Sequence, residues 1–569
     1  MAIVESNTQS EMPEMPEVPV VPEPSGAPIA PMPTAPVVAA PRGAGHWVRA
    51  LIVGLIGGAV ATSAMLLVFG LFRIVLGIPT PPESIPDRLA PVLRIPEFFS
   101  LFDRFGGYNG LKRLGVTSML AGMIAVGFLL SILYALAVEN SRTIDPARRY
   151  RRGIGWAALG MLAVALALVA VLSLGVVAPV LATNFRGLSP GPATAATVIG
   201  WLVAYLTFGV SLVLVCRLMT NPAPMREALP LGGELLARRS LLAIAAAVVG
   251  TVATGGILRT LNAQAVFTYD GNQYRGTDLQ PITPNDRFYS VTKNVVDPTP
   301  TKTLWRLEVG GDVTNGRAYT FDELAALPNV EQETTLMCIS NGVDGGLMSN
   351  ARWRGVPLAT VLGSAALKPG VTEVKLSGAD GYTDTIPLAK ALDPTTLLVY
   401  TMNGEPIPQK HGYPVRVIVP GMYGEKNVKW VTRIEPVIHP VQGFYEQQGW
   451  GPDFTVHTRA RIDAPDPGRP VPAGMPVDIR GIALGGDRGV SRVEVSTDDG
   501  RTWQDARIEY PGTKLSWAFW RFPWQPTGPG EYHVLARATD GMGGVQAPEV
   551  HDIVPQGARG YHRVTLRVQ

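Results

Sequence analysis

The sequence is poor in the residues that usually hold redox metals. Its 569 residues include two cysteines, Cys216 and Cys338, and seven histidines. An iron–sulfur cluster needs about four cysteine ligands, and covalent haem attachment needs a Cys-x-x-Cys-His run. Before His411 the chain has one histidine, His46, so the histidine pair that would hold a haem between helices is missing. We therefore expect neither haem nor an iron–sulfur cluster.

Charge is also scarce. Asp, Glu, Lys and Arg make up 17% of the chain, against roughly 25% in an average soluble protein. The formal net charge is only +3, and no long basic stripe with interleaved aromatic residues occurs, so nucleic acid is not an expected partner. A chain of this length predicts roughly three or four modules. The shortage of charge indicates that one of them lies in a membrane.

Long apolar runs are abundant and support this interpretation. Each is about as long as the 18 to 20 residues that cross a bilayer, and none has the polar face of an amphipathic helix. We predict an α-helical transmembrane bundle of five spans within residues 46–262, after a disordered cytoplasmic tail at 1–45 that is rich in Pro, Ala, Val and Glu. The spans are expected at about 48–72, 117–138, 154–182, 196–216 and 241–258.

Arginines predict the orientation of the spans. Five of them lie between residues 139 and 153, and loops rich in Lys and Arg stay in the cytoplasm. Five crossings then leave everything after Leu261 outside the cytoplasm of a bacterial cell. Arg238 and Arg239 precede the fifth run. They resemble a twin-arginine export signal, although two arginines anchoring a helix at the cytosolic interface explain the same pattern.

Beyond residue 265 the sequence pattern changes to short β-rich stretches separated by Gly and Pro. This pattern predicts a mostly β domain with few helices. Strands are expected at 304–309, 373–376, 397–402 and 415–419. After the Pro-rich stretch 465–472, alternating patterns predict a small β-sandwich with strands at 476–482, 490–496, 503–508 and 532–538.

Cys338 lies where an extended stretch ends in a polar, glycine-rich turn, Cys-Ile-Ser-Asn-Gly. A single cysteine is more often a small buried apolar residue than a ligand. Pairing with Cys216 is excluded by topology, since that residue falls at the cytoplasmic end of the fourth span. An unpaired exported thiol is open to oxidation unless a soft metal occupies it. A metal-ligating thiolate is therefore one of two open interpretations.

A second cluster favours the metal interpretation. The run from Lys410 to Arg416 leads into a strand, and the turn Gly421–Trp430 that follows carries two lysines and open backbone amides. Cationic side chains and main-chain N–H groups are what an anionic, phosphate-bearing cofactor requires. Read alone, such a cluster is more often a solvated turn with surface lysines. Together with Cys338 it indicates a cofactor site.

These segments resemble the sulfite oxidase family of molybdopterin-dependent oxidoreductases, including membrane-anchored bacterial members with a C-terminal Ig-like dimerisation domain. The likeness covers roughly residues 280–569 and rests on the Cys338 run, on 353–358, on 398–430, and on 493–503 with 537–540 in the last module. It implies an α+β, mostly β, molybdopterin domain at 265–455 and an all-β Ig-like sandwich at 459–569.

The resemblance also implies the roles of individual residues. Cys338 is the thiolate ligand of molybdenum, and no further catalytic residue is assigned. Animal members of the family have charged residues after this cysteine, whereas Ile339 to Val343 carry no cation, and a tyrosine near the metal is replaced by Trp450. Lys293, Arg352 and Arg354 are candidates for a cationic pocket. The implied cofactor contacts are Asn285, Tyr289, Ser290, Asp380, His411, Arg416, Asn427, Val428 and Lys429.

The expected activity is a two-electron oxygen-atom transfer at a molybdenum–molybdopterin cofactor, acting on a small molecule. Sulfite oxidation and reduction of a sulfoxide or N-oxide both fit. Electrons would pass to or from a separate carrier, a cytochrome or a quinone-linked membrane protein, and the last domain implies a possible homodimer. The alternative is a non-enzymatic surface receptor or adhesion protein with a β-rich ectodomain, which gives Cys338 no role.

Overall fold

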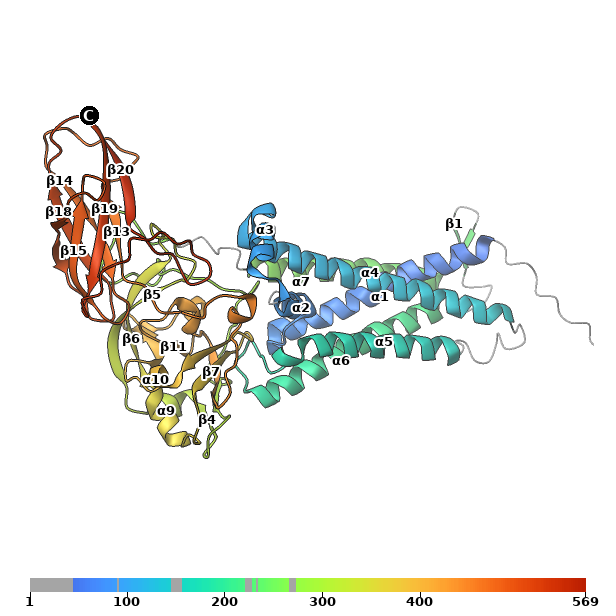
Figure 1. The fold of residues 1–569 in the computed structure, drawn as a ribbon. Coiled ribbons are helices and arrows are strands. Elements are labelled where there is room, and N and C mark those ends of the chain that lie inside the picture. Colours follow the sequence, from blue (N-terminus) through green and yellow to red (C-terminus); the bar gives the residue numbers. More distant parts are fainter. Residues whose placement is uncertain (1–43, 90–91, 145–155, 221–227, 232–233, 266–272) are drawn as a thin grey trace, which may run out of the picture. The chain divides into compact units, whose positions relative to one another are not determined.

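The computed structural model describes residues 44–89, 92–144, 156–220, 228–231, 234–265 and 273–569 (Figure 1). The tail predicted at residues 1–45 falls almost wholly outside these ranges. Four of the five arginines between 139 and 153 lie outside them as well. The orientation of the spans therefore stays a prediction.

Five long apolar helices occupy the N-terminal part, as predicted. They are α1 (Ala44–Leu76), α4 (Gly107–Ile144), α5 (Trp156–Val177), α6 (Pro190–Thr220) and α7 (Arg238–Ala263), and each contains a stretch long and apolar enough to cross a membrane. Close packing joins α1 to α4, because a Cβ on Gly54 would lie 2.7 Å from the backbone of Ile132. Membrane crossing itself remains a prediction from length and composition.

Two short helices in the segment between the first two spans were not predicted. They are α2 (Pro81–Leu89) and α3 (Ile95–Arg104), and their length and prolines hide the helical pattern. Arg73, at the end of α1, pairs with Glu83 of α2 at 2.9 Å and donates to the carbonyl of Val296 at 3.2 Å. Lys112 donates to the carbonyl of Asn294 at 2.8 Å. Side chains of the helical part thus hold the irregular segment 292–296.

The β-rich domain contains two five-stranded sheets around a core of Trp305, Leu307, Val361, Leu398 and Val417. One sheet has the order β10-β9-β6-β5, with β11 on β9, and the other has the order β4-β3-β12-β7-β8. The strands are β3 (Arg306–Val309), β4 (Arg317–Thr320), β5 (Val330–Met337), β6 (Met348–Pro357), β7 (Glu373–Gly378), β8 (Thr383–Pro387), β9 (Leu397–Met402), β10 (Glu405–Pro406), β11 (Arg416–Ile418) and β12 (Val431–Val437).

Short helices fill the connections of this domain: α8 (Phe321–Ala325), α9 (Leu358–Ala365) and α10 (Leu388–Ala391). The β5–β6 hairpin places Cys338 one residue beyond the sheet, because the register runs from Val330↔Gly355 to Met337↔Met348. The amide of Cys338 still donates to the carbonyl of Leu347 at 3.0 Å. The thiol therefore stands at a rigid strand end.

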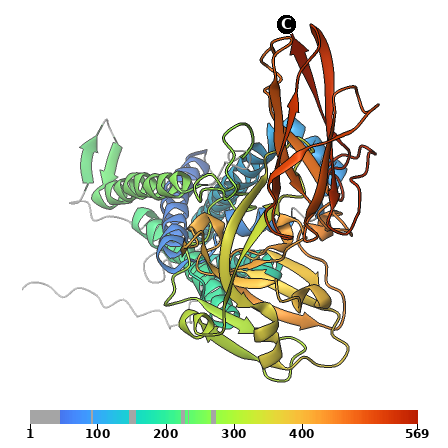
Figure 2. The ribbon, with the colours of Figure 1, turned by 90° about the vertical axis from the view of Figure 1, so that its left-hand side faces the viewer.

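The C-terminal residues form two four-stranded sheets packed face to face (Figure 2). Their orders are β13-β14-β18-β17 and β16-β15-β19-β20. The single strand predicted at 503–508 was wrong, since the chain changes sheets at Ala506. The strands are β13 (Arg459–Ala464), β14 (Val477–Leu484), β15 (Val490–Ser496), β16 (Gln504–Asp505), β17 (Arg507–Tyr510), β18 (Ala518–Trp524), β19 (Gly530–Asp540) and β20 (His562–Val568).

Candidate cofactor site

A cavity of about 330 Å³ in the β-rich domain collects most of the predicted site residues. That volume falls within the range of ligand pockets, roughly 300 to 1,000 Å³. The walls come from the segment before β3, the end of β5, and the turns around β11. Predicted residues that line the cavity are Tyr289, Ser290, Lys293, Cys338, Asp380, His411, Arg416, Asn427, Val428, Lys429 and Trp450.

Cys338 forms one end of the cavity. Its Sγ lies 3.1 Å from Oγ of Ser340. Burial, together with the nearby carboxylate of Glu425, raises the pKa of the thiol to about 11. A thiol with so high a pKa is protonated at neutral pH, and it becomes a thiolate when a metal ion replaces its proton.

The loop that follows Cys338 is held from outside by strand β13. Arg459 donates to the carbonyl of Gly342 at 3.1 Å, and Arg461 donates to that of Gly345 at 2.7 Å. Both arginines are buried, and Asp463 pairs with Arg461 at 2.9 Å. The C-terminal sandwich therefore helps to position the loop that carries the thiol.

The opposite end of the cavity is cationic. Nζ of Lys429 donates to the carbonyl of Lys410 at 3.0 Å, and burial lowers the pKa of this lysine to about 8. The guanidinium of Arg416 donates to the carbonyls of His411 at 2.9 Å and Asn427 at 3.0 Å. Arg416 thus ties together the two turns of the predicted cofactor motif.

His411 and Asn427 take their positions from backbone groups. Nε2 of His411 lies 3.0 Å from the carbonyl oxygen of Asn285, and burial, followed by the charge of Lys429, holds the histidine pKa well below its ordinary value. Asn427 accepts from the amide of Val419 at 2.7 Å. Its amide nitrogen donates to the carbonyl of Tyr423 at 2.9 Å. The side chain of Asn427 therefore shapes the turn.

Of the three cations considered for the pocket, Lys293 lines it. Its ammonium pairs with Asp87 of α2 and donates to the carbonyl of Asp380 at 3.0 Å. Asp380 also accepts from Nδ2 of Asn294 at 3.0 Å. Arg352 and Arg354 are exposed and lie on β6 outside the cavity lining.

Two known domain families match the β-rich domain and the C-terminal sandwich. The family model "Oxidoreductase molybdopterin binding domain" matches residues 294–445, and "Mo-co oxidoreductase dimerisation domain" matches 454–569. Sulfite oxidase of Gallus gallus is 31% identical over 321 residues, which cover 48% of this chain and 69% of that protein. The chain belongs to the sulfite oxidase family of molybdenum-dependent oxidoreductases.

Further members of the family and one solved structure are similar over about half of the chain. Mitochondrial sulfite oxidase of Rattus norvegicus is 33% identical over 50% of this chain and 62% of its own. The sulfane dehydrogenase SoxCD of Paracoccus pantotrophus is 27% identical, with a TM-score of 0.44, over 47% of this chain and 75% of that chain. The chain spans about six-tenths of the length of the first mitochondrial relatives, 62% and 58%.

One predicted family contact does not reach the cavity with its side chain. The amide oxygen of Asn285 accepts from Nδ2 of Asn403 at 2.8 Å, and its amide nitrogen points to Glu405 and the carbonyl of Met402. Asn285 touches the site through its backbone carbonyl, which contacts His411. A direct cofactor contact by Asn285 stays a prediction.

Thr292, Tyr382 and Glu425 line the cavity and were not singled out from the sequence. Tyr382 donates to Asp384 at 2.8 Å and to the backbone carbonyl of Glu425 at 3.1 Å. Both carboxyl oxygens of Glu425 are buried, and burial raises the pKa of this acid to about 8, although the backbone N–H groups of Glu425 and Ile339 act to lower it. In the sequence, Glu425 is an acid followed by Lys426, and such a pair is typical of a solvated turn rather than of a buried site.

The residues present fit the cofactor of the family. A thiol stands at one end, while Lys429 and Arg416 stand at the end where an anionic phosphate group would be held. Nε of Arg416 is buried, with no hydrogen-bond partner in the described part of the chain. An unsatisfied buried donor is unfavourable, so a ligand acceptor in the cavity would stabilise the site.

Proposed function

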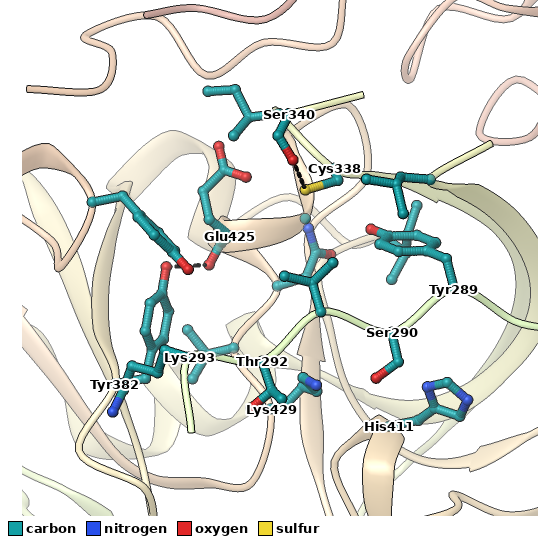
Figure 3. A pocket seen from close by; sticks show the side chains of 18 of the residues that line it. Tyr289, Ser290, Thr292, Lys293, Cys338, Ser340, Tyr382, His411, Glu425 and Lys429 are labelled. Carbon is teal, nitrogen blue, oxygen red and sulfur yellow. Dashed lines mark hydrogen bonds between the residues drawn. The ribbon is translucent and has the colours of Figure 1, made fainter. Parts of the chain in front are cut away.

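We propose that the chain is a membrane-anchored molybdenum-cofactor oxidoreductase that transfers an oxygen atom to or from a small substrate on the extracytoplasmic side. The observation that carries this proposal is the pairing of a strand-end thiol with a cationic group of residues in one cavity. Figure 3 draws Cys338 at one end and Lys429 with His411 at the other. The sulfite oxidase family provides the cofactor class.

When bound, the molybdenum cofactor supplies the two-electron redox change. The chain's own residues bind and orient it. Cys338 would donate its thiolate to the metal, and Lys429 would pair with the pterin phosphate. Arg416 would hold the surrounding turns. The remaining proposed contacts are Asn285, Tyr289, Ser290, Asp380, His411, Asn427 and Val428.

The five apolar helices would hold the enzyme in a bacterial cell membrane, with the catalytic domain outside the cytoplasm. We infer that electrons move through a separate carrier, a cytochrome or a quinone-linked membrane protein. The match to a dimerisation domain supports a homodimer. Further details of these proposals, including an immunoglobulin-like character of the sandwich and export directed by Arg238 and Arg239, follow from the sequence alone.

The test is metal analysis of the purified full-length protein from cells that make the cofactor. We expect molybdenum and pterin phosphate in equal amounts, close to one of each per chain. Steady-state assays should then be run in both directions, with sulfite plus an electron acceptor and with an oxide plus a reduced dye. Protein that is folded but free of molybdenum would overturn the proposal and favour the receptor alternative.

A further inference from the structure

The helical part, which runs from α1 to α7, contributes to the wall of the cofactor cavity. Phe98 of α3 lines the cavity. The turn that carries Asp380 packs directly against the loop before α6, because a Cβ on Gly381 would lie 2.8 Å from Cγ2 of Thr183. Both contacts come from outside residues 294–445, the segment that the molybdopterin-binding model matches. The cavity is therefore not built by the β-rich domain alone.

Hydrogen bonds from the helical part also hold the backbone beside the cavity. Lys112 of α4 donates to the carbonyl of Thr292, which lines the cavity, and to that of Asn294 at 2.8 Å. Further along the chain, the amide of Thr299 donates to the carbonyl of Phe185 at 2.8 Å. Groups from two loops of the helical part thus fix this stretch of backbone along its length.

Lys293 is the side chain of this stretch that pairs with an acid of the helical part. It is buried, and its Nζ pairs with the carboxylate of Asp87 in α2. The same Nζ donates to the carbonyl of Asp380 at 3.0 Å and to Oδ1 of Asn294 at 3.3 Å. An ammonium has three N–H donors, and these three acceptors satisfy all of them. Figure 3 shows Lys293 at the end of the cavity where Lys429 lies.

We propose that Asp87 is a positioning residue of the cofactor site. It acts through Lys293, and the pair fixes the wall formed by residues 288–293, all of which line the cavity. The inference rests on the cofactor binding proposed above. It adds to that proposal a residue far outside both matched domains, and it gives the segment between the first two spans a role beyond anchoring.

The carboxylate of Asp87 is needed because Lys293 is buried. A buried ammonium that loses its counter-charge is strongly unfavourable. The chain can relieve this only if the lysine loses its proton or if its side chain turns to another acceptor. Either change weakens the bonds from Lys293 to Asp380 and Asn294. The wall at 288–293 then loses a contact that fixes it, and a bound cofactor dissociates faster.

The test is a double-substitution cycle in the full-length protein. Asp87→Asn removes the charge at constant size, Lys293→Met removes the ammonium, and a third variant combines the two. Asp87→Glu keeps the charge and tests for rescue. Glu97→Gln is the matched control, because Glu97 is an exposed acid of α3 in the same segment between the spans.

The first measurement is the rate at which molybdenum and pterin leave the purified protein at a fixed temperature below its melting transition. Asp87→Asn should release both about 10-fold faster than the wild type, since groups that orient a metal site from behind are worth about 10- to 100-fold. Asp87→Glu and Glu97→Gln should stay within about 3-fold. The combined variant should release the cofactor no faster than Lys293→Met alone, because methionine leaves Asp87 no cation to hold.

The second measurement is hydrogen–deuterium exchange in protein made without the cofactor. The amides of Phe288, Tyr289 and Asn294 are hydrogen-bonded within the wall, so their exchange reports on its opening. Asp87→Asn should raise exchange about 10-fold in peptides that cover 288–299 and should leave strand β15 unchanged. A general loss of stability would raise exchange in both places.

Additive losses in the combined variant would overturn the inference, because Asp87 would then act without Lys293. Unchanged release in Asp87→Asn, or exchange that rises equally in β15, would do the same. If Asp87→Asn gives no folded protein, folding of the combined variant supports the inference and its failure to fold contradicts it. Wild-type protein that binds no molybdenum would refute the proposed function instead, and exchange in cofactor-free protein would still test Asp87.

Discussion

The two ends of the cavity differ in how they are built. At the cationic end, Arg416 at the start of β11 and Lys429 in the turn after that strand belong to one continuous run, and backbone carbonyls hold both side chains. At the thiol end, Cys338 and Trp450 come from two distant segments, and they meet Glu425 of the continuous run. The difference suggests a division of labour. The continuous run is suited to a cofactor that the whole family shares, whereas the assembled end can change its side chains and so its substrate.

Replacement of Cys338 by serine should have the largest effect and tests the thiol end directly. We expect activity to fall by more than about 100-fold, because even changes to groups behind a metal ligand cost 10- to 100-fold. The absorption band of a thiolate bound to metal should also disappear. Cys216→Ser is the matched control, since Cys216 is buried in α6. An unchanged spectrum and unchanged activity in Cys338→Ser would refute the ligand assignment.

Replacement of Lys429 by methionine tests the cationic end. Loss of a charge-assisted bond to phosphate, worth about 1.5 to 3 kcal/mol, should weaken cofactor retention by about 10- to 100-fold. Molybdenum and pterin remaining after dialysis at high salt measure this. Lys410→Met is the control, because Nζ of Lys410 donates to the carbonyl of Asp286 near the surface. If Lys429→Met and Lys410→Met retain equal amounts of cofactor, Lys429 has no special role in binding the phosphate.

The dependence of stability on pH should distinguish the two ends of the cavity by its sign. In cofactor-free protein, Glu425 has its pKa raised from 4.5 to about 8. The folded form then holds the extra proton, and stability should fall as pH rises through this window. Lys429 has its pKa lowered from 10.5 to about 8. Here the unfolded form holds the extra proton, so stability should rise between pH 8 and 10.5.

Thermal melting across pH measures both trends. Glu425→Gln should remove the fall below pH 8, and Lys429→Met should remove the rise above it. If Tm changes with pH in Glu425→Gln as it does in the wild type below pH 8, the raised pKa of Glu425 is wrong. The same result for Lys429→Met above pH 8 would contradict the lowered pKa of Lys429.

The predictable parts of the fold are those encoded by local patterns. Five apolar runs became five long helices, because length and hydropathy are properties of contiguous residues. The strands expected at 373–376, 397–402 and 490–496 are present as β7, β9 and β15. Helices α2 and α3 were missed, since they are short and contain proline. The strand expected at 503–508 was divided because Ala506 marks a change of sheet, which depends on partners distant in sequence.

The site residues also divide into those that the sequence predicted and those that it did not. The run 410–430 and Cys338 were recognisable by their residue types, and the cavity brings them together. Whether Lys293, Arg352 or Arg354 faces the cavity could not be read from the chain, because it depends on the side of the sheet and on Asp87 of α2. Glu425 went unnoticed because a surface acid and a buried acid look alike in sequence.

By itself, the sequence determined the family, the thiol and the cationic run of this protein, since these are matters of residue type and spacing. Only the tertiary structure decided which charges are neutralised and which acid stands beside Cys338. It also revealed that Arg459 and Arg461 of the last domain hold the thiol loop. The physical reason is that charge and hydrogen bonding act through space, so their outcome depends on which distant segments the fold brings within a few ångströms of each other.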